Sequence, residues 1–283
     1  MKRCSLPDGT SVPALGLGTW YLGEKKPLEQ QEITALRVGI EGGATLIDTA
    51  EMYGDGQSEL LVGKAIAPYD REGLFLISKV YPWNAGKRGI FDACEGSLRR
   101  LGTEYLDLYL LHWRGSIPLA ETISCMQQLK AQGKIRRWGV SNLDLHEMQQ
   151  LLRLPGGGGC QADEVLFHLG SRGIEYDLWP WLRERRIPVI AYCPLMQGGS
   201  LRRSVADSPV VRDIAGRHGI TPMQVLLAFV LQQEQVIAIP RSGNPAHVRE
   251  NLAAAEIVLT PAERSALDSA FPPPNRSVPL DIV

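Results

Sequence analysis

Short apolar runs rich in β-forming residues recur along the chain. There are eight of them, and most successive centres lie about 25 to 32 residues apart. That spacing leaves room for one strand, one helix and two short loops, which is the period of repeated βα units. The runs are continuously apolar rather than alternating, so the strands are expected to be buried on both faces of a parallel sheet. The runs occupy residues 15–19, 45–48, 74–80, 106–112, 138–142, 163–167, 188–193 and 236–240.

Helical patterns fill the segments between these runs. Apolar residues spaced three or four apart predict helices over 32–43, 58–66 and 121–134. The long interval before the last run contains two candidates, 208–219 and 221–233. Thr221 is a suitable N-cap for the second, and Pro222 suits its first helical position.

Alternating strands and helices predict an α/β protein, and eight units predict a closed (β/α)8 TIM barrel. The rival is a doubly wound sheet of fewer strands. Such a sheet ordinarily shows G-x-G-x-x-G after a strand, and the sequence contains no such match.

The two ends of the chain differ from the repeating part. Asp8-Gly9 separates two short β-capable segments, which predicts an N-terminal β-hairpin within residues 1–14. The prolines of residues 271–283 exclude a regular helix and predict an irregular C-terminal tail, while 154–160 is expected to be a flexible loop. No change of composition marks a boundary, so residues 1–283 are expected to form a single domain.

Composition limits the possible partners. Thirty basic and 31 acidic residues give a net charge of −1, so neither nucleic acid nor membrane is an expected partner. Five cysteines without a C-x-x-C pair and five histidines without ligand spacing predict neither a disulfide framework nor a metal site. No apolar run approaches the roughly 18 residues that a membrane span requires. We therefore expect a soluble cytoplasmic protein, and a monomer.

Polar residues stand at the ends of six predicted strands. In a barrel the carboxyl ends of the strands converge on one face, which carries the chemistry. Singly, each residue has a structural explanation: a helix cap, a hydrogen-bonded core histidine or a solvated lysine. An acid, a lysine and a histidine on three consecutive strands favour an active site, because burying one requires the others as partners. These residues are Asp48, Lys79, His112, Ser141-Asn142, Tyr192 and Arg241-Ser242.

The segments around these residues resemble the signature segments of the aldo-keto reductases. The resemblance runs nearly end to end, and within the family it is greatest to bacterial reductases of methylglyoxal and related small aldehydes. It implies hydride transfer from NADPH to a carbonyl carbon, with a catalytic tetrad of Asp48, Tyr53, Lys79 and His112. The segments are GATLIDTAEMYG, FLISKVYPWN, YLDLYLLHW, RRWGVSNLD, AYCPL and IPRSGNPAHVREN.

Elementary chemistry explains why these residue types suit that reaction. A phenol with a pKa of ~10 is a reluctant acid, and a nearby ammonium such as Lys79 lowers that pKa. Asp48 would keep the buried lysine charged and in position. His112, neutral at one nitrogen, could donate a hydrogen bond that orients the substrate carbonyl.

The resemblance also implies a binding site for the cofactor. Ser141 and Asn142 match the pair that holds the carboxamide, and Tyr192 matches the aromatic residue that stacks on the nicotinamide. Pro194 and Leu195 would cover the pyrophosphate. Residues matching the surroundings of the 2′-phosphate and adenine are Arg241, Ser242, His247 and Asn251, and the set is completed by Gly18, Thr19, Trp20 and Glu164.

Four residues at or next to these positions differ from the residues that are usual in the family. Arg241 replaces the usual lysine and keeps a charge for phosphate, whereas His247 replaces an arginine and mostly loses one. Cys193 replaces a serine, so it is either an inert small residue or a site of oxidation that hinders cofactor binding. Glu164 replaces a glutamine. As an ionised carboxylate it would attract the oxidised nicotinamide and tighten its binding; alternatively it bonds only the carboxamide NH₂ and changes little.

Three tryptophans are expected to ring the substrate pocket near Tyr53: Trp20, Trp83 and Trp113. They suit small carbonyl compounds, although each could instead pack under a loop. The short segment after His112 predicts an open, shallow site in which Arg114 attracts polar or anionic groups. Two other functions stay open: a redox sensor that holds cofactor but turns over slowly, and an isomerase or aldolase that uses Lys79 as a Schiff base. Asp48 argues against the Schiff base because it keeps Lys79 charged.

Overall fold

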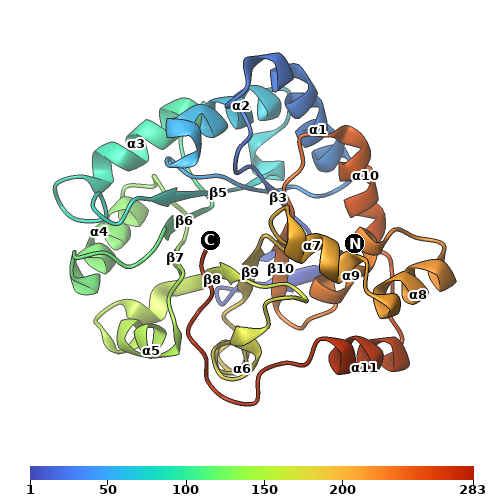
Figure 1. Ribbon diagram of the computed structural model, residues 1–283. Helices are drawn as coiled ribbons and strands as arrows, with labels where there is room; N and C mark the ends of the chain where they lie inside the picture. The colour runs from blue at the N-terminus through green and yellow to red at the C-terminus, as the bar shows by residue number, and fades with distance from the viewer.

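Eight parallel strands form one curled sheet at the centre of the molecule. The computed structural model describes residues 1–283. The strands are neighbours in chain order from β3 to β10, and the helices surround them (Figure 1). All eight lie within the predicted runs or overlap them closely, so the predicted α/β alternation is confirmed. The strands are β3 (Leu17–Gly18), β4 (Leu46–Asp48), β5 (Phe75–Val80), β6 (Leu108–Leu111), β7 (Trp138–Ser141), β8 (Cys160–Leu166), β9 (Val189–Tyr192) and β10 (Val236–Ile239).

The first and last strands of this sheet are joined to each other. Parallel bridges pair Leu15 with Ala238 and Gly18 with Arg241. The Gly18 amide donates to the Pro240 carbonyl at 3.2 Å. A Cβ on Gly18 would lie 2.6 Å from the Ile239 carbonyl oxygen, so only glycine allows this approach. The sheet therefore curls until its edges meet.

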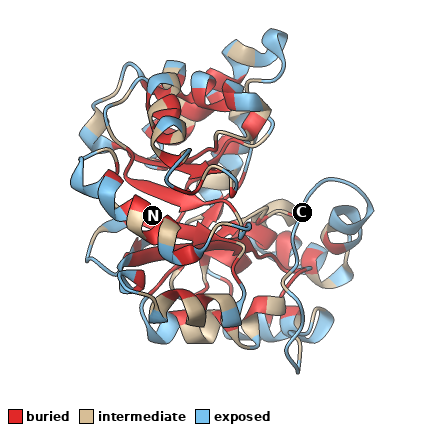
Figure 2. Ribbon diagram, turned by 90° about the vertical axis from the view of Figure 1, so that its left-hand side faces the viewer, coloured by how far each residue is buried: buried red, intermediate tan, exposed pale blue.

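Helices cover the outside of the sheet, with their exposed faces turned to solvent and their buried faces toward the strands (Figure 2). The α-helices are α1 (Glu29–Glu41), α2 (Gln57–Ile66), α3 (Ile90–Leu101), α4 (Leu119–Ala131), α5 (Leu145–Arg153), α6 (Leu178–Glu184), α7 (Ser200–Ala206), α8 (Pro209–His218), α9 (Pro222–Leu231), α10 (Pro245–Ala254) and α11 (Pro261–Ala270). The short 3₁₀ turns are η1 (Lys26–Leu28), η2 (Tyr53–Gly56), η3 (Arg71–Gly73), η4 (Gly157–Gly159) and η5 (Gly173–Glu175).

The predicted helices form α1, α2, α4, α8 and α9, and the interval before β10 contains three helices rather than two because α7 precedes α8. Helix α9 begins as predicted: Thr221 accepts a hydrogen bond from the Gln224 amide, and the Gln224 side chain accepts one from the Thr221 amide. No single helix is long and apolar enough to cross a membrane; only α8 and α9 together, bent by 92°, reach that length and hydropathy.

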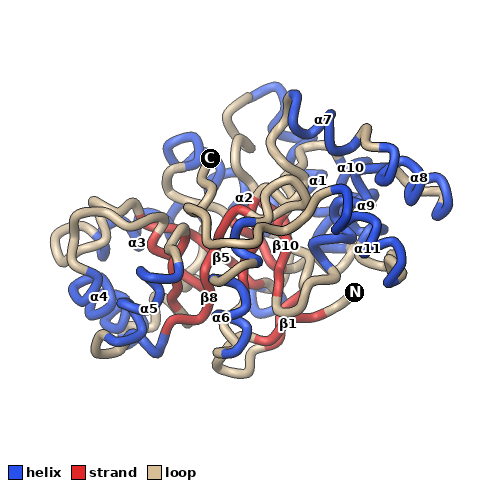
Figure 3. The backbone as a smooth tube through the Cα atoms, turned by 60° about the horizontal axis from the view of Figure 1, so that its bottom comes forward, coloured by secondary structure: helices blue, strands red, loops and turns tan.

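An antiparallel hairpin closes one end of the barrel. Strands β1 (Arg3–Ser5) and β2 (Ser11–Pro13) pair across a turn in which Gly9 has a φ of +88°. The Asp8 side chain accepts a hydrogen bond from the Thr10 amide at 2.9 Å. This hairpin is the one predicted from Asp8-Gly9, and it lies at the end of the molecule away from the chain's C-terminus (Figure 3). Cys4, Leu6 and Val12 pack against the apolar side chains inside the barrel.

The interior of the barrel changes character along the strands. Side chains alternate between the interior and the helix layer, so residues two apart share a face. The apolar interior near the hairpin includes Leu46, Ile77, Leu110, Ala162 and Ile190. Two residues further along the same strands stand Asp48, Lys79, His112, Glu164 and Tyr192. The interior thus passes from an apolar layer to a polar one within a single step of the pleat.

Residues 271–283 form the predicted irregular tail, which crosses the outside of the barrel toward the polar end. Ser277 Oγ donates to an Asp177 oxygen at 2.7 Å, and Ser171 Oγ donates to Asp281. The last two residues, Ile282 and Val283, reach the cavity described below. The predicted loop 154–160 contains η4 and the first residue of β8.

Candidate active site

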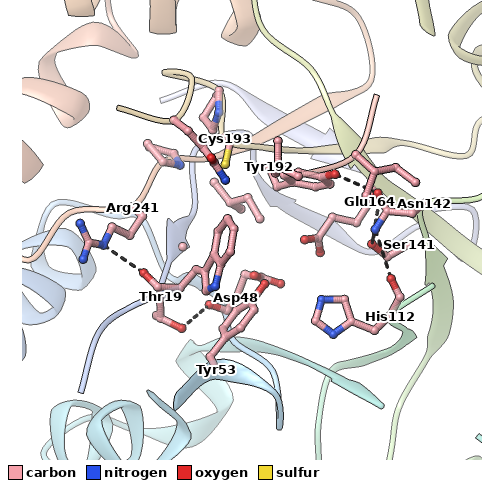
Figure 4. A pocket seen from close by; sticks show the side chains of 18 of the residues that line it. Thr19, Asp48, Tyr53, His112, Ser141, Asn142, Glu164, Tyr192, Cys193 and Arg241 are labelled. Atoms are coloured by element: carbon pink, nitrogen blue, oxygen red, sulfur yellow. Dashed lines mark hydrogen bonds between the residues drawn. The ribbon is translucent and has the colours of Figure 1, made fainter. Parts of the chain in front are cut away.

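A cavity of about 770 Å³ opens at the polar end of the barrel. It is lined by the carboxyl ends of the strands and the loops that follow them, as the barrel prediction requires (Figure 4). Most of the predicted site residues meet there. Those that line the cavity are Gly18, Thr19, Trp20, Asp48, Tyr53, His112, Trp113, Ser141, Asn142, Glu164, Tyr192, Pro194, Leu195 and Arg241.

Lys79 lies under the cavity floor and is fully buried on β5. Its Nζ lies 2.7 Å from both carboxylate oxygens of Asp48 and donates to the Thr49 carbonyl at 3.1 Å. It also donates to Tyr53 Oη at 3.2 Å, and Glu164 Oε1 lies 3.3 Å away. One ammonium group therefore contacts two acids and the phenol that lines the cavity.

These contacts determine the charge of the lysine. Burial by itself lowers the pKa of Lys79, but the carboxyl groups of Asp48 and Glu164 raise it above its ordinary value. Lys79 is consequently an ammonium ion at neutral pH. A Schiff base requires a neutral amine that a substrate can reach, and Lys79 is neither neutral nor exposed.

Tyr53 follows β4 and is placed by the tight turn η2, in which Gly54 and Asp55 adopt left-handed φ angles of 56° and 51°. The side chain is nearly buried, with 8% of it exposed at the cavity wall. Burial raises the pKa of Tyr53, and Lys79 offsets only part of that effect. Lys79 thus lowers the pKa of the phenol as expected, but the desolvation of the phenol raises it by more.

His112 follows β6 and presents its ring edge to the Tyr53 ring, with 5.8 Å between the ring centroids. Burial and the nearby Lys79 lower the pKa of His112 to about 3, so its imidazole is neutral at physiological pH. Its Nδ1 is buried without a partner. The neutral ring predicted from the sequence fits this environment.

Ser141, Asn142 and Tyr192 form a hydrogen-bonded group on the opposite wall (Figure 4). Tyr192 Oη donates to Asn142 Oδ1 at 2.9 Å, and Asn142 Nδ2 donates to Ser141 Oγ at 3.0 Å. Ser141 Oγ donates in turn to the Glu164 carbonyl at 2.9 Å. Asn142 has a φ of +60°, a conformation that asparagine tolerates better than most residues. These bonds fix the orientation of the Tyr192 ring on the cavity wall.

Glu164 lies among these groups, and its environment disfavours the ionised carboxylate considered from the sequence. Burial and the Asp48 carboxylate raise the pKa of Glu164 well above its ordinary value, and Lys79 offsets this only in part. Its Oε2 is buried without a partner. The buried site thus favours the protonated form of Glu164 over the ionised carboxylate considered from the sequence, and a protonated carboxyl can both donate and accept a hydrogen bond, as an amide does.

The three predicted pocket tryptophans have different positions. Trp20 and Trp113 line the cavity on either side of Tyr53 and His112. Trp83 does not line it, which corrects the prediction. It is 63% exposed and stacks on Tyr81, with ring centroids 4.3 Å apart, because the loop after β5 turns it outward.

The outer part of the site carries arginines. Arg241 lines the cavity and donates from Nε to the Trp20 carbonyl at 3.0 Å. Arg114 also lines it, but it is bonded to Gln150 at 2.9 Å and lies 3.7 Å from Glu147. The charge of Arg114 is thus partly engaged within the protein.

Three predicted cofactor residues lie outside the cavity wall. Ser242 bonds the backbone of Asn244 just before α10, while His247 and Asn251 stand on α10 itself. Cys193 lies half-buried on the wall with a φ of +48°. Burial raises the pKa of its thiol to about 11, which favours the unreactive protonated form.

Sequence reasoning missed several residues of the cavity wall. Arg202 comes from α7, a helix that the pattern did not reveal, and Met196 from the loop before it. Ile282 and Val283 come from the tail, where the prolines indicated only that no helix forms. No signal in the sequence could have placed the tail at the cavity.

The residues present fit a nicotinamide dinucleotide. Glu164 Oε2 and His112 Nδ1 are buried polar atoms without partners at the inner end, and unsatisfied atoms of this kind are expected where a polar ligand binds. Tyr192 offers a ring on the wall, and Arg202 and Arg241 supply positive charge for phosphate further out. No group of three or more histidine, cysteine or acidic side chains could hold a metal ion.

Comparison with known proteins gives one consistent result. Residues 14–271 match the model described as the aldo/keto reductase family. The chain is 55% identical over 282 residues to methylglyoxal reductase YeaE of Escherichia coli, covering 100% of this chain and 99% of that protein. It is 52% identical to the crystal structure of an aldo/keto reductase from Klebsiella pneumoniae in complex with NADP and acetate, with a TM-score of 0.97 and coverage of 100% and 99%. A Klebsiella pneumoniae aldo-keto reductase in complex with NADPH is also 52% identical, with a TM-score of 0.96 and full coverage of both chains.

Proposed function

This chain belongs to the aldo/keto reductase family, and from that premise we propose that it reduces small aldehydes and ketones such as methylglyoxal to alcohols with NADPH. It is an oxidoreductase. One contact carries the proposal: Tyr53 Oη lies 3.2 Å from a lysine that Asp48 binds through both oxygens, at the wall of a cavity of about 770 Å³.

We assign the acid step to Tyr53. When bound, NADPH supplies the hydride that adds to the carbonyl carbon. Tyr53 gives its proton to the carbonyl oxygen, and the Lys79 ammonium stabilises the phenolate that remains. Asp48 keeps Lys79 protonated and fixes its position. A neutral His112 orients the carbonyl by a hydrogen bond, which stabilises the charge that develops on oxygen.

We assign cofactor binding to the opposite wall. Ser141, Asn142 and Glu164 present polar groups suited to the carboxamide, and the fixed Tyr192 ring offers a stacking surface for the nicotinamide. Arg241 provides a charge for the 2′-phosphate. The two Klebsiella pneumoniae structures with NADP and NADPH support this choice of cofactor.

We further infer that the fold is the complete (β/α)8 barrel and that residues 1–283 form one domain. The bridges between residues 15–18 and 238–241 support closure, and the hairpin and tail both pack on the same barrel. The monomeric state and the cytoplasmic location predicted from the sequence stay predictions.

The test follows NADPH absorbance with methylglyoxal and with an aromatic aldehyde. Tyr53→Phe removes the acid and is expected to lower kcat by about 10²–10⁴-fold. Tyr69→Phe is the matched control, since the Tyr69 hydroxyl contacts only Glu41 on the surface. Equal slow turnover in wild type and Tyr53→Phe would overturn the proposal.

A further inference from the structure

Two carboxyl groups share one lysine at the floor of the cavity. Asp48 contacts Lys79 Nζ through both oxygens at 2.7 Å, whereas Glu164 does so through one oxygen at 3.3 Å. The second oxygen of Glu164 is buried and has no partner. All three side chains are almost fully buried, with exposed fractions of 2% or less.

Ionising both carboxyl groups of this cluster would cost free energy. Two negative charges and one positive charge would leave a net negative charge in a buried site. Asp48 has the closer contact with the Lys79 ammonium, so Asp48 is assigned as the ionised carboxylate and Glu164 as the carboxyl group that carries a proton. Burial and Asp48 raise the pKa of Glu164 well above its ordinary value, which agrees with this assignment. The titratable groups that surround it are Asp48 of β4, Tyr53 of η2, Lys79 of β5, His112 after β6, Tyr192 of β9 and Cys193.

We propose that Glu164 stores a proton for carbonyl reduction: it is protonated before the reaction, supplies a proton through Lys79 to Tyr53, and is left ionised beside the oxidised cofactor. The contacts of Lys79 with Glu164 and Tyr53, at 3.3 Å and 3.2 Å, form the path. This inference rests on the proposed function, because the reductase reaction is what consumes the proton.

The transfer balances in protons and electrons. The reduced nicotinamide is oxidised as its hydride reduces the carbonyl carbon. The Tyr53 O–H bond breaks as the new alcohol O–H bond forms. Lys79 then gives an N–H proton to the phenolate oxygen, and Glu164 gives its O–H proton to the lysine nitrogen. The site ends with Tyr53 and Lys79 in their starting forms, and Glu164 is a carboxylate that regains a proton from water.

The neighbouring residue provides a contrast within the same strand. Asp163 is also fully buried, and the environment raises its pKa well above the ordinary value. Its side chain is on the other face of β8, toward the segment before α5, and does not line the cavity. Asp163 therefore has no path to Lys79, and Asp163→Asn is a matched control for Glu164→Gln.

The main test measures the affinities of NADP⁺ and NADPH by tryptophan fluorescence between about pH 7 and pH 9. If NADP⁺ binding expels the Glu164 proton, its Kd falls with rising pH by up to about tenfold per unit relative to the Kd of NADPH. Both cofactors carry the same phosphates, so the ratio of the two Kd values isolates the nicotinamide end. The ratio should be independent of pH in Glu164→Gln and unchanged from wild type in Asp163→Asn. A flat ratio in wild type, or an equal slope in Glu164→Gln, would overturn the proposal.

Two further measurements separate this inference from the proposed function. Infrared spectroscopy of the protein alone should show a protonated carboxylic acid band that Glu164→Gln removes and Asp163→Asn retains; a spectrum that Glu164→Gln leaves unchanged contradicts the proton store without reference to activity. The kcat of wild type should fall as the pH rises and Glu164 ionises. The kcat of Glu164→Gln should not show this fall. If Tyr53→Phe proves as active as wild type, the proposed function fails, while the infrared spectrum still reports on Glu164.

Discussion

The interior of the barrel is apolar at the hairpin end and ionisable at the cavity end. The same strands supply both layers: Leu46 precedes Asp48, Ile77 precedes Lys79 and Leu110 precedes His112, each by two residues. In the first layer side chains are held by packing alone. In the second they are held by hydrogen bonds and charge, around a lysine with no exposed surface. One step of the pleat therefore separates the residues that stabilise the fold from those assigned to chemistry.

Replacing the cation should produce the largest effect in the polar layer. Lys79→Met keeps the length of the side chain but removes the charge that stabilises the Tyr53 phenolate. We expect kcat to fall by about 10²-fold or more, while the circular dichroism spectrum stays that of a folded protein. Lys64→Met is the control, because Lys64 pairs with Glu29 at the surface. A folded Lys79→Met protein with nearly normal kcat would show that the polar layer is structural.

A truncation in the apolar layer should instead lower the stability of the protein and leave kcat nearly unchanged. Leu110→Ala leaves a cavity inside the barrel and should lower the free energy of unfolding by about 2–5 kcal/mol. Because His112 is still held two residues further along the chain, kcat should change little. Urea unfolding and steady-state rates measure the two effects. Leu60→Ala, at an exposed position, is the control. A large loss of kcat with intact stability would contradict the division between the layers.

A pH-dependent effect should show whether burial also raises the pKa of a carboxyl group that lies outside the polar layer. Asp163 is buried on the outer face of β8, and its pKa is raised well above the ordinary value by that burial. In the unfolded chain an aspartate has a pKa of ~3.9, whereas Asp163 in the folded protein keeps its proton to a higher pH. Above the unfolded pKa, the free energy of unfolding of wild type therefore falls relative to that of Asp163→Asn by about 1.4 kcal/mol per pH unit. This fall ends where Asp163 ionises in the folded protein. Asp163→Asn should therefore stabilise the protein more at pH 8 than at pH 5.

Urea unfolding across that pH range measures the difference between the two proteins. Asp92→Asn, at an exposed site on α3, should show a difference that does not vary with pH in this way. A constant difference between wild type and Asp163→Asn would mean that Asp163 is ionised in the native state.

Much of this organisation follows from short-range patterns that the sequence displays. The eight strands could be predicted because each is a short continuous apolar run, as expected of strands buried on both faces. The positions of Asp48, Lys79 and His112 followed from the geometry of parallel strands, whose carboxyl ends meet. Helices such as α6 and α10 were not predicted, because short helices owe most of their stability to packing rather than to an apolar period.

Other features depend on contacts between distant residues. Trp83 stacks on Tyr81 outside the cavity wall, and a count of tryptophans does not reveal that contact. The pKa of Glu164 is raised because the residue is buried and lies beside Asp48, which already pairs with Lys79. Asp48 and Lys79 are 31 residues apart, and the sequence does not display their contact. The tail reaches the cavity through bonds such as that between Ser171 and Asp281.

The joining of the first strand to the last bears on how the protein is made. The amide of Gly18 bonds the carbonyl of Pro240, and Arg241 bonds the carbonyl of Trp20. A ribosome adds about 5–20 residues per second, so the early strands wait many seconds for the partner that completes their sheet. Contacts between such distant residues also slow folding in general. The nascent chain must therefore keep an open, apolar sheet edge from pairing with other chains, and the cavity exists only once the final strand has left the ribosome.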